Sequence, residues 1–270
     1  MLLTRIITAV ILIPLVIWLI YFAPIALFNA VIFIILLRAG WEWSLFCSKG
    51  MAKRMFYVII LAILTLLLYF NAFNHLLLYI FVFCLWVWSG IAVICYQKNN
   101  QWCGLNLAPL QKIMGWFMLV ACGLGLHDLI HMPNGSNYVM ALLLLVWAND
   151  TGAYFAGRFW GQKKLADKVS PKKTWAGLWG GAVLTLVVYF AMNLLSAVPL
   201  PIMARQLPWI FVIIYFSIIG DLFESLLKRQ AGIKDSSNIL PGHGGLLDRI
   251  DSLLAATPAF ILMILLEHFM

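Results

Sequence analysis

The sequence predicts an all-α fold: a polytopic, integral membrane bundle of about nine transmembrane helices, with the N-terminus in the cytoplasm. Composition is the first reason, because hydrophobic residues make up 64% of the chain and charged residues only 10%. A typical soluble domain has about 25% charged residues. The second reason is the series of apolar runs, each about 20 residues long, which is the length of a helical span. These runs are continuously apolar and do not alternate, so they favour helices over the strands of a membrane barrel.

Nine spans follow from these runs. The first is too long for a signal peptide and lacks a small-residue cleavage site, so we expect it to be retained. The second is interrupted by Arg38 and Glu42, which are four apart and could pair on one helix face. The third to fifth are apolar runs between short polar connections, the sixth has Asp150 near its end, and charged stretches separate the last three. The predicted ranges are 6–22, 25–45, 55–71, 75–95, 113–131, 137–157, 176–197, 207–225 and 251–268.

The distribution of basic residues predicts the orientation. With a cytoplasmic N-terminus, every Lys and Arg except Arg205 lies on the cytoplasmic side, as the positive-inside rule requires. The net charge of +8 is then mainly a topology signal, and we expect no nucleic-acid partner. The basic connections would face anionic lipid headgroups and cytosolic nucleotides. We therefore expect a protein of a bacterial-type inner or plasma membrane.

The acidic residues predict where the chemistry lies. Seven of the ten lie between Asp150 and Asp251. We therefore divide the chain into residues 1–135, a scaffold of membrane helices open to lipid or oligomer contacts, and residues 136–270, which form a catalytic site at the cytoplasmic face. A homodimer is one assembly that this division allows.

Several of these acids lie at the ends of predicted spans. A charged side chain at the centre of a span costs about 2.5–3.5 kcal/mol, so such groups persist when they are paired or hold a cation. Asp221 and Glu224 share a helix face, as do Asp248 and Asp251. One interpretation is a site for Mg²⁺, which prefers oxygen ligands. The alternatives are internal salt bridges with nearby Lys and Arg residues, and for Asp251 a helix N-cap.

Two loops could hold phosphate. In the stretch 161–177, Ser170, Lys172, Lys173 and Thr174 precede a helix N-terminus, which favours anions. Non-specific binding of anionic lipid by these lysines is the alternative. In the stretch 241–245, PGHGG, the glycines permit a tight turn with exposed amides. There His243 could stabilise the turn, contact phosphate, or act as a base or metal ligand.

The second loop belongs to a longer charged stretch of 27 residues, 225–251, with four basic and three acidic side chains. The positions in this stretch that form a recognisable series are Ser225, Leu227, Lys228, Arg229, Lys234, Asp235, Pro241, His243, Gly244, Gly245, Leu246, Asp248, Arg249, Ile250 and Asp251. This series resembles the signature of the phosphatidate cytidylyltransferases, also called CDP-diacylglycerol synthases. The segments 149–154 and 170–174 are similar to the family as well, whereas the N-terminal half is similar only in being hydrophobic.

The resemblance implies an enzyme that joins CTP to phosphatidate in the membrane, giving CDP-diacylglycerol and pyrophosphate, with Mg²⁺ as cofactor. It implies Asp221 and Asp248 as the metal carboxylates, and we add Glu224, Asp251 and Asp150 as further candidates. We expect Lys228, Arg229 and Arg249 to act with them on the phosphates. The substrate-binding candidates are Ser170, Lys172, Lys173, Thr174, Ser225, Lys234, His243, Gly244 and Gly245.

Two other functions compete with this one. A CTP-dependent lipid kinase would also need a metal and basic loops, and it would release CDP in place of pyrophosphate. A cation-coupled transporter would use Asp150, Asp221 and Glu224 as a relay. It would have acids deep in several spans and repeated halves, neither of which the sequence has.

Overall fold

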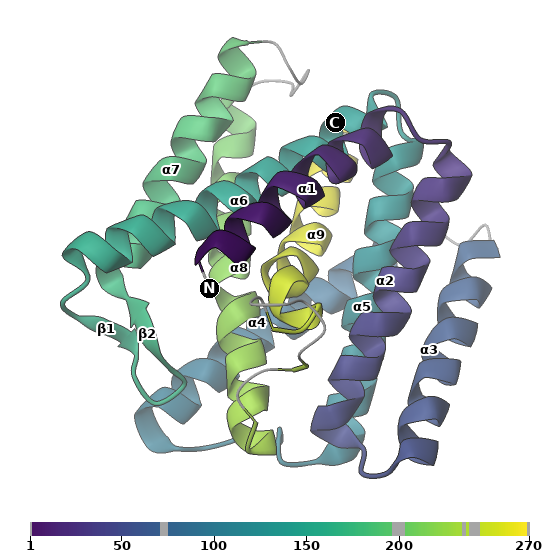
Figure 1. Ribbon diagram of the computed structural model, residues 1–270, viewed down its shortest axis with the longest axis vertical. Coiled ribbons are helices and arrows are strands. Elements are labelled where there is room, and N and C mark those ends of the chain that lie inside the picture. The colour runs from purple at the N-terminus through teal and green to yellow at the C-terminus, as the bar shows by residue number, and fades with distance from the viewer. Residues whose placement is uncertain (1, 71–74, 196–202, 234–235, 238–243, 269–270) are drawn as a thin grey trace.

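The computed structural model describes residues 2–70, 75–195, 203–233, 236–237 and 244–268, and within them it has nine helices and one β-hairpin (Figure 1). In chain order the elements are α1 (Leu2–Tyr21), α2 (Ile25–Cys47), α3 (Met51–Phe70), α4 (Leu76–Asn99), α5 (Ala108–His131), α6 (Gly135–Trp160), β1 (Lys164–Ala166), β2 (Ser170–Thr174), α7 (Trp175–Leu194), α8 (Met203–Ala231) and α9 (Leu247–His268). Each predicted span overlaps one helix, with differences at the ends. The all-α prediction is confirmed, with the short hairpin as an addition.

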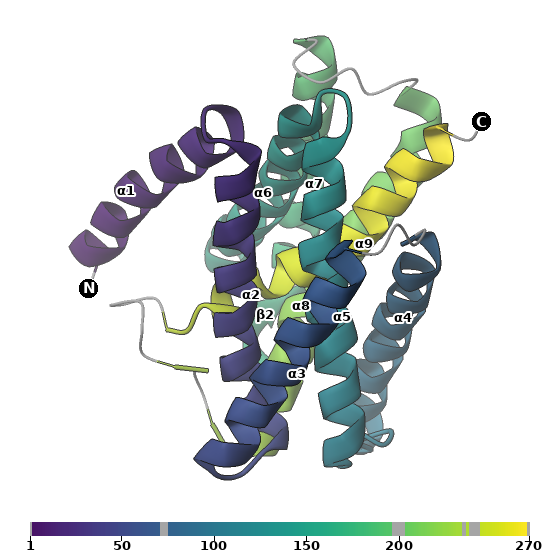
Figure 2. The same ribbon diagram turned by 90° about the vertical axis from the view of Figure 1, so that its right-hand side faces the viewer.

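Eight of these helices, α2 to α9, are long and apolar enough to cross a membrane. The first differs, because the part of α1 whose side chains the structure describes, Val10–Tyr21, is shorter than a span. In Figure 2, α1 leans away from the bundle. Near its end it is tied to α6, where Ser136 Oγ donates to the Ile20 carbonyl at 2.8 Å and Tyr21 Oη donates to Asn137 at 3.0 Å.

Local sequence explains the helix boundaries. The connection between α2 and α3 turns at Gly50, whose φ of +92° favours glycine. Helix α4 is followed by its C-cap Asn100 in the left-handed conformation, and Gly232, at φ +70°, follows the end of α8. The Thr174 side chain caps α7 by accepting a hydrogen bond from the Gly177 amide at 3.1 Å.

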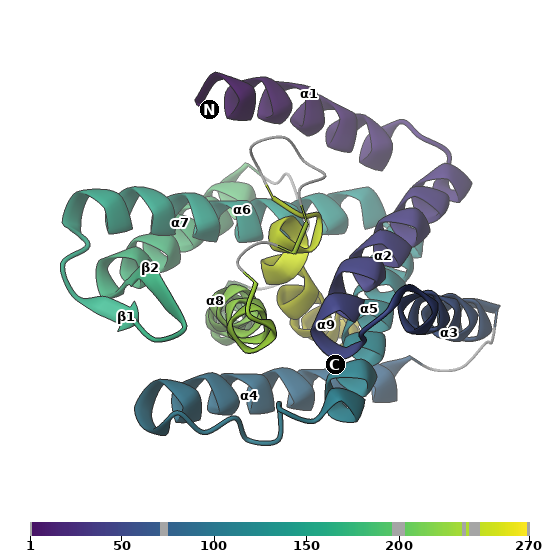
Figure 3. The same ribbon diagram turned by 60° about the horizontal axis from the view of Figure 1, so that its bottom comes forward.

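The bundle is organised around α5, α8 and α9. Helix α5 packs against α2, α3 and α9, and α9 packs against α8 and α4. Viewed from below, α8 is seen end-on between the hairpin, α4 and α9 (Figure 3). Helices α6 and α7 pack closely because small residues face each other, and a Cβ added at Gly152 or Gly180 would collide with the partner helix.

Tertiary hydrogen bonds hold the antiparallel β1–β2 hairpin against the ends of α4 and α8. In its turn, the Lys168 amide donates to Gln97 Oε1 of α4 at 3.1 Å. Arg229 Nε of α8 donates to the Val169 carbonyl at 3.2 Å. The hairpin therefore places β2 beside the charged end of α8.

Candidate active site

A cavity of about 480 Å³ opens between α6, the hairpin, α7, α8 and α9. Residues far apart in the sequence meet there, because five elements contribute side chains. Most of the predicted site residues line it: Asp150, Ser170, Lys172, Lys173, Thr174, Asp221, Lys228, Asp248, Arg249 and Asp251.

Carboxylates come to this cavity from three helices. Asp221 of α8 pairs with Lys173 of β2, with Nζ and Oδ2 2.8 Å apart. Asp150 of α6 accepts a hydrogen bond from Ser252 Oγ of α9 at 3.3 Å. Ser252 was not among the predicted residues, and its position beside Asp251 was the only signal for it.

The N-cap alternative for Asp251 is wrong. Helix α9 begins at Leu247, four residues before the predicted start of the span, so Asp251 lies inside the helix. The Glu42 carboxylate accepts a hydrogen bond from the Leu247 amide at 2.7 Å. The first amide of α9 therefore has Glu42 as its acceptor in place of Asp251. Asp251 is 9% exposed and lines the cavity.

The internal salt-bridge alternative holds for Glu224. Lys228 Nζ lies 3.0 Å from Glu224 Oε2 and also donates to Asp248 Oδ1. Glu224 is buried and is not among the residues that line the cavity. Its other oxygen, Oε1, has no hydrogen-bond partner in the part of the chain that the structure describes.

Asp248 organises the segment before α9. Its Oδ2 accepts from the Ser236 amide at 3.1 Å, the Ser236 hydroxyl at 2.9 Å and the Gly245 amide at 2.8 Å. Gly244 has a φ of +82°, and a Cβ at Gly245 would overlap Ser236 Oγ and the Glu42 carboxylate. The Gly245 amide thus contacts a carboxylate here, where the sequence suggested phosphate.

Glu42 is the main residue that sequence reasoning missed. The predicted pairing with Arg38 is confirmed, at 3.1 Å. In addition, the fully buried carboxylate accepts from Ser236 Oγ at 2.9 Å and Ser237 Oγ at 2.6 Å. The Leu246 amide donates to it at 3.1 Å, beside the Leu247 amide. An acid inside an apolar span was the available signal for such a role.

The remaining predicted residues divide into three groups. Ser170, Lys172, Arg249 and Thr174 line the cavity, and the hydroxyl of Thr174 also caps α7. Arg229 and Ser225 are not among the lining residues: Arg229 holds the hairpin, and Ser225 Oγ donates to Asp221 Oδ1 at 3.4 Å. Lys234 and His243 lie outside the described residues.

The donors in the cavity fit a magnesium ion that shares its coordination with substrate. Asp150, Asp221 and Asp251 supply hard oxygens from three helices. Within the described residues, no three His, Cys, Asp or Glu side chains are close enough to hold a metal by themselves. Mg²⁺ usually keeps several waters and binds through one or two carboxylates and substrate phosphates, so an incomplete protein shell is compatible with this ion.

Comparison with known proteins agrees with the resemblance in the signature. Residues 3–267 match the model of the cytidylyltransferase family. The chain is 36% identical over 263 residues to a phosphatidate cytidylyltransferase of Pseudomonas aeruginosa, covering 96% of both chains. It is 35% identical over 248 residues to one of Haemophilus influenzae, covering 82% of this chain and 83% of the relative. A Bacillus subtilis phosphatidate cytidylyltransferase is 40% identical over 151 residues, which is 54% of this chain.

Proposed function

The chain belongs to the cytidylyltransferase family, and from that premise we propose that the cavity between α6, α7, α8 and α9 is its active site. The enzyme transfers a cytidylyl group from CTP to phosphatidate, giving CDP-diacylglycerol and pyrophosphate. The observation that supports the location is the convergence of carboxylates and lysines, from segments similar to the family, on one space among spanning helices.

The nucleophile in this reaction needs little activation. A phosphate monoester has a second pKa near 6, so the phosphatidate phosphate is largely ionised at neutral pH. It attacks the α-phosphorus of CTP in line, and the bond to pyrophosphate breaks. No Ser–His pair is required, and His243 is not needed as a base.

The main demand on the site is to neutralise charge, because two anions must meet. We assign Ser170, Lys172 and Lys173 to the nucleotide, and Lys228 and Arg249 to the phosphates, since all five line the cavity. Aimed at the charge that develops in the transition state, such donors stabilise it without moving. We propose that Arg229 acts indirectly, by holding the hairpin through the Val169 carbonyl.

We propose that Mg²⁺ is held by one or two of the cavity carboxylates together with substrate phosphates, with Asp221 as the first ligand and Asp150 or Asp251 as the second. Asp248 stays a candidate ligand that also fixes the segment 244–247. When bound, the ion would supply positive charge to the phosphates and so stabilise the attacking and leaving groups. Lys173 now neutralises Asp221, so it would pass from the carboxylate to the nucleotide phosphates as the ion and CTP bind.

We also propose that the cavity opens to the cytoplasm, where CTP is available. The hairpin beside it has Lys163, Lys164 and Lys168 as well as the two lysines in the cavity, and such clusters favour the cytoplasmic side.

The test is an assay of the purified protein with CTP, phosphatidate and Mg²⁺ that follows both products. CDP-diacylglycerol and pyrophosphate should appear in equal amounts, and a chelator should stop turnover until Mg²⁺ is restored. The Asp221→Asn variant should lose most of this turnover. CDP with a newly phosphorylated lipid would establish the kinase instead, and full activity without a divalent cation would refute the metal site.

A further inference from the structure

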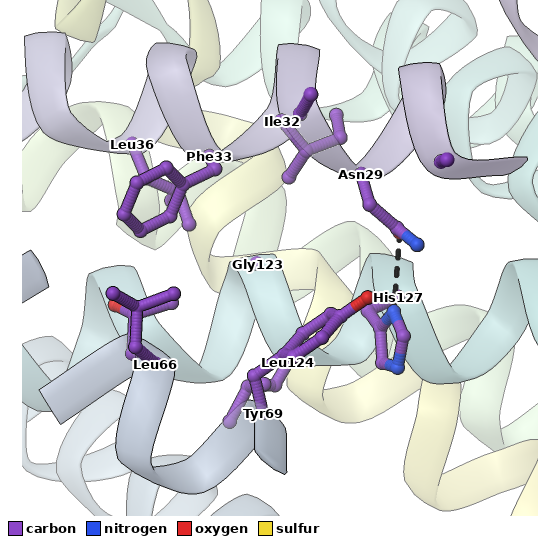
Figure 4. A pocket seen from close by; sticks show the side chains of 12 residues that line it. Asn29, Ile32, Phe33, Leu36, Leu66, Tyr69, Gly123, Leu124 and His127 are labelled. Carbon is purple, nitrogen blue, oxygen red and sulfur yellow. Dashed lines mark hydrogen bonds between the residues drawn. The ribbon is translucent and has the colours of Figure 1, made fainter.

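A second cavity, of about 250 Å³, lies between α2, α3 and α5 (Figure 4). None of the described residues lines both cavities. It lies in the early part of α2 and the late parts of α3 and α5, and thus toward the ends of these helices that are far from Glu42 and the segment before α9. The reaction proposed above makes no use of it.

The lining of this cavity changes from apolar to polar along its length. Leu36, Leu66 and Gly123 lie at one end, and Asn29, Tyr69 and His127 at the other, as Figure 4 shows. Asn29 lies in the second turn of α2, Tyr69 is the penultimate residue of α3, and His127 is four residues before the end of α5. The polar end is therefore near the helix ends, and the apolar end extends inward along the spans.

Hydrogen bonds and ring contacts order the polar end. His127 Nδ1 lies 3.1 Å from Asn29 Oδ1, and the Tyr69 ring lies 4.5 Å from the imidazole, centroid to centroid. The neighbouring acid on α5, Asp128, is 2.8 Å from His75 Nδ1 and accepts from the Tyr79 hydroxyl at 2.6 Å. That carboxylate is therefore engaged elsewhere, and amide, hydroxyl and imidazole groups remain at the polar end of the cavity.

We propose that this cavity binds a glycerophospholipid, with one acyl chain along the apolar end and the phosphate near Asn29, Tyr69 and His127. The order of polarity matches a lipid in a bilayer, whose phosphate lies at the membrane surface and whose chain extends inward. Lipid can reach this cavity from the bilayer, because α2, α3 and α5 are all of spanning length and composition.

The test uses the full-length protein in vesicles that contain a trace of phosphatidylethanolamine with a photoreactive diazirine in one acyl chain. After irradiation, the labelled peptides should come from α2, α3 and α5 around the cavity. The variant Ala30→Leu fills the cavity and should lower this labelling at least five-fold. Ala30 lines the cavity and is exposed. The matched control is Ala191→Leu, at an exposed alanine of α7 away from the cavity, which should label like the original protein.

Turnover of CTP and phosphatidate shows whether each variant is folded, since both alanines are remote from the active-site cavity. If Ala30→Leu lacks turnover, Ala26→Leu fills the same cavity from the first turn of α2 and replaces it. Equal labelling of the filled variant and the original protein would overturn the proposal. So would cross-links between two copies of the chain at this face in place of lipid adducts.

A second probe tests the phosphate contact. Diacylglycerol with the same diazirine lacks the phosphate and should label the cavity at least five-fold less than phosphatidylethanolamine. The variant Asn29→Leu should reduce labelling by the phospholipid and leave labelling by diacylglycerol unchanged. Equal labelling by both probes would overturn the assignment of the polar end to a phosphate.

Discussion

The ion pair between Lys173 and Asp221 connects the hairpin to α8 across the proposed active-site cavity. Both side chains are partly exposed, 25% and 37%, and exposed pairs stabilise folds by about 1 kcal/mol at most. Its contribution to stability is therefore small. Its value lies in placing an ammonium group beside a carboxylate where a nucleotide and a metal ion are proposed to bind.

For this reason Lys173→Ala should impair catalysis far more than stability. We expect kcat/KM for CTP to fall about 100-fold, the usual effect of removing one donor to a transition state. The melting temperature should stay close to that of the original protein. Both are measured on purified protein, by pyrophosphate release and by thermal unfolding.

The matched control is Lys168→Ala, in the turn of the same hairpin. Lys168 does not line the cavity, and its backbone amide makes the bond to Gln97. This variant should keep its activity within about two-fold. A loss as large as that of Lys173→Ala would mean that the lysines act through overall charge.

Glu42, unlike Lys173, should matter strongly for stability. Its carboxylate is completely buried and accepts four hydrogen bonds from the segment 236–247. The Glu42→Leu variant leaves these donors without their acceptor, and each buried unsatisfied group costs about 1–3 kcal/mol. We expect a clear loss of melting temperature together with lost turnover. Arg38→Gln removes only the ion pair and should lose less of both. Equal losses would show that Glu42 acts mainly through Arg38.

At the scale of elements, the sequence predicts the helices better than their ends. The predicted eighth span stops at residue 225, yet α8 continues to Ala231. The apolar run ends there, but Lys228 is paired with Glu224 and Asp248, so the helix can continue through charged residues. The hairpin was not predicted because a strand as rich in lysine as β2 has low β-propensity, and bonds to Gln97 and Arg229 fix it.

The candidate site, like the helices, was predictable from the sequence only in part. Its carboxylates and lysines are visible in the sequence, because charges are rare in this chain. The contribution of Glu42 could not be predicted from the sequence. Its partners lie about two hundred positions away, and neither spacing nor periodicity connects them to it.

The contact between α6 and α7 gives a prediction at this scale. Gly152→Leu should separate the two helices, because even a Cβ at this position would meet the Gly180 carbonyl. Since both helices line the cavity, we expect lower thermal stability and at least a ten-fold loss of turnover. Ala191→Leu, near the other end of α7, serves as the control and should retain both. An active, stable Gly152→Leu protein would show that the close packing is dispensable.

At the scale of the whole molecule, orientation is the central question, and Cys103 is a natural reporter. It is exposed in the connection between α4 and α5, on the side that should be cytoplasmic. A membrane-impermeant maleimide should label it in inside-out vesicles and not in right-side-out vesicles. The Cys103→Ser variant shows which signal belongs to this residue. Labelling only from the outside would invert the topology and contradict a cytosolic active site.

The same residue gives a pH dependence. Desolvation, together with a hydrogen bond to Cys95, raises the pKa of the Cys103 thiol above its ordinary value of 9.0. The thiolate is the reactive form, so a raised pKa lowers its fraction at neutral pH. The labelling rate should therefore keep rising as the pH increases through 9. A rate that levels off below pH 8 would contradict this environment.

The bonds between Glu42 and the start of α9 also impose an order on biosynthesis. Helix α2 leaves the ribosome about two hundred residues before Leu247, whose amide it will bind. During that interval the Glu42 carboxylate has Arg38 but lacks its other partners. A chain that stops before Ser236 would therefore retain in its second helix an acid whose only partner among these is Arg38.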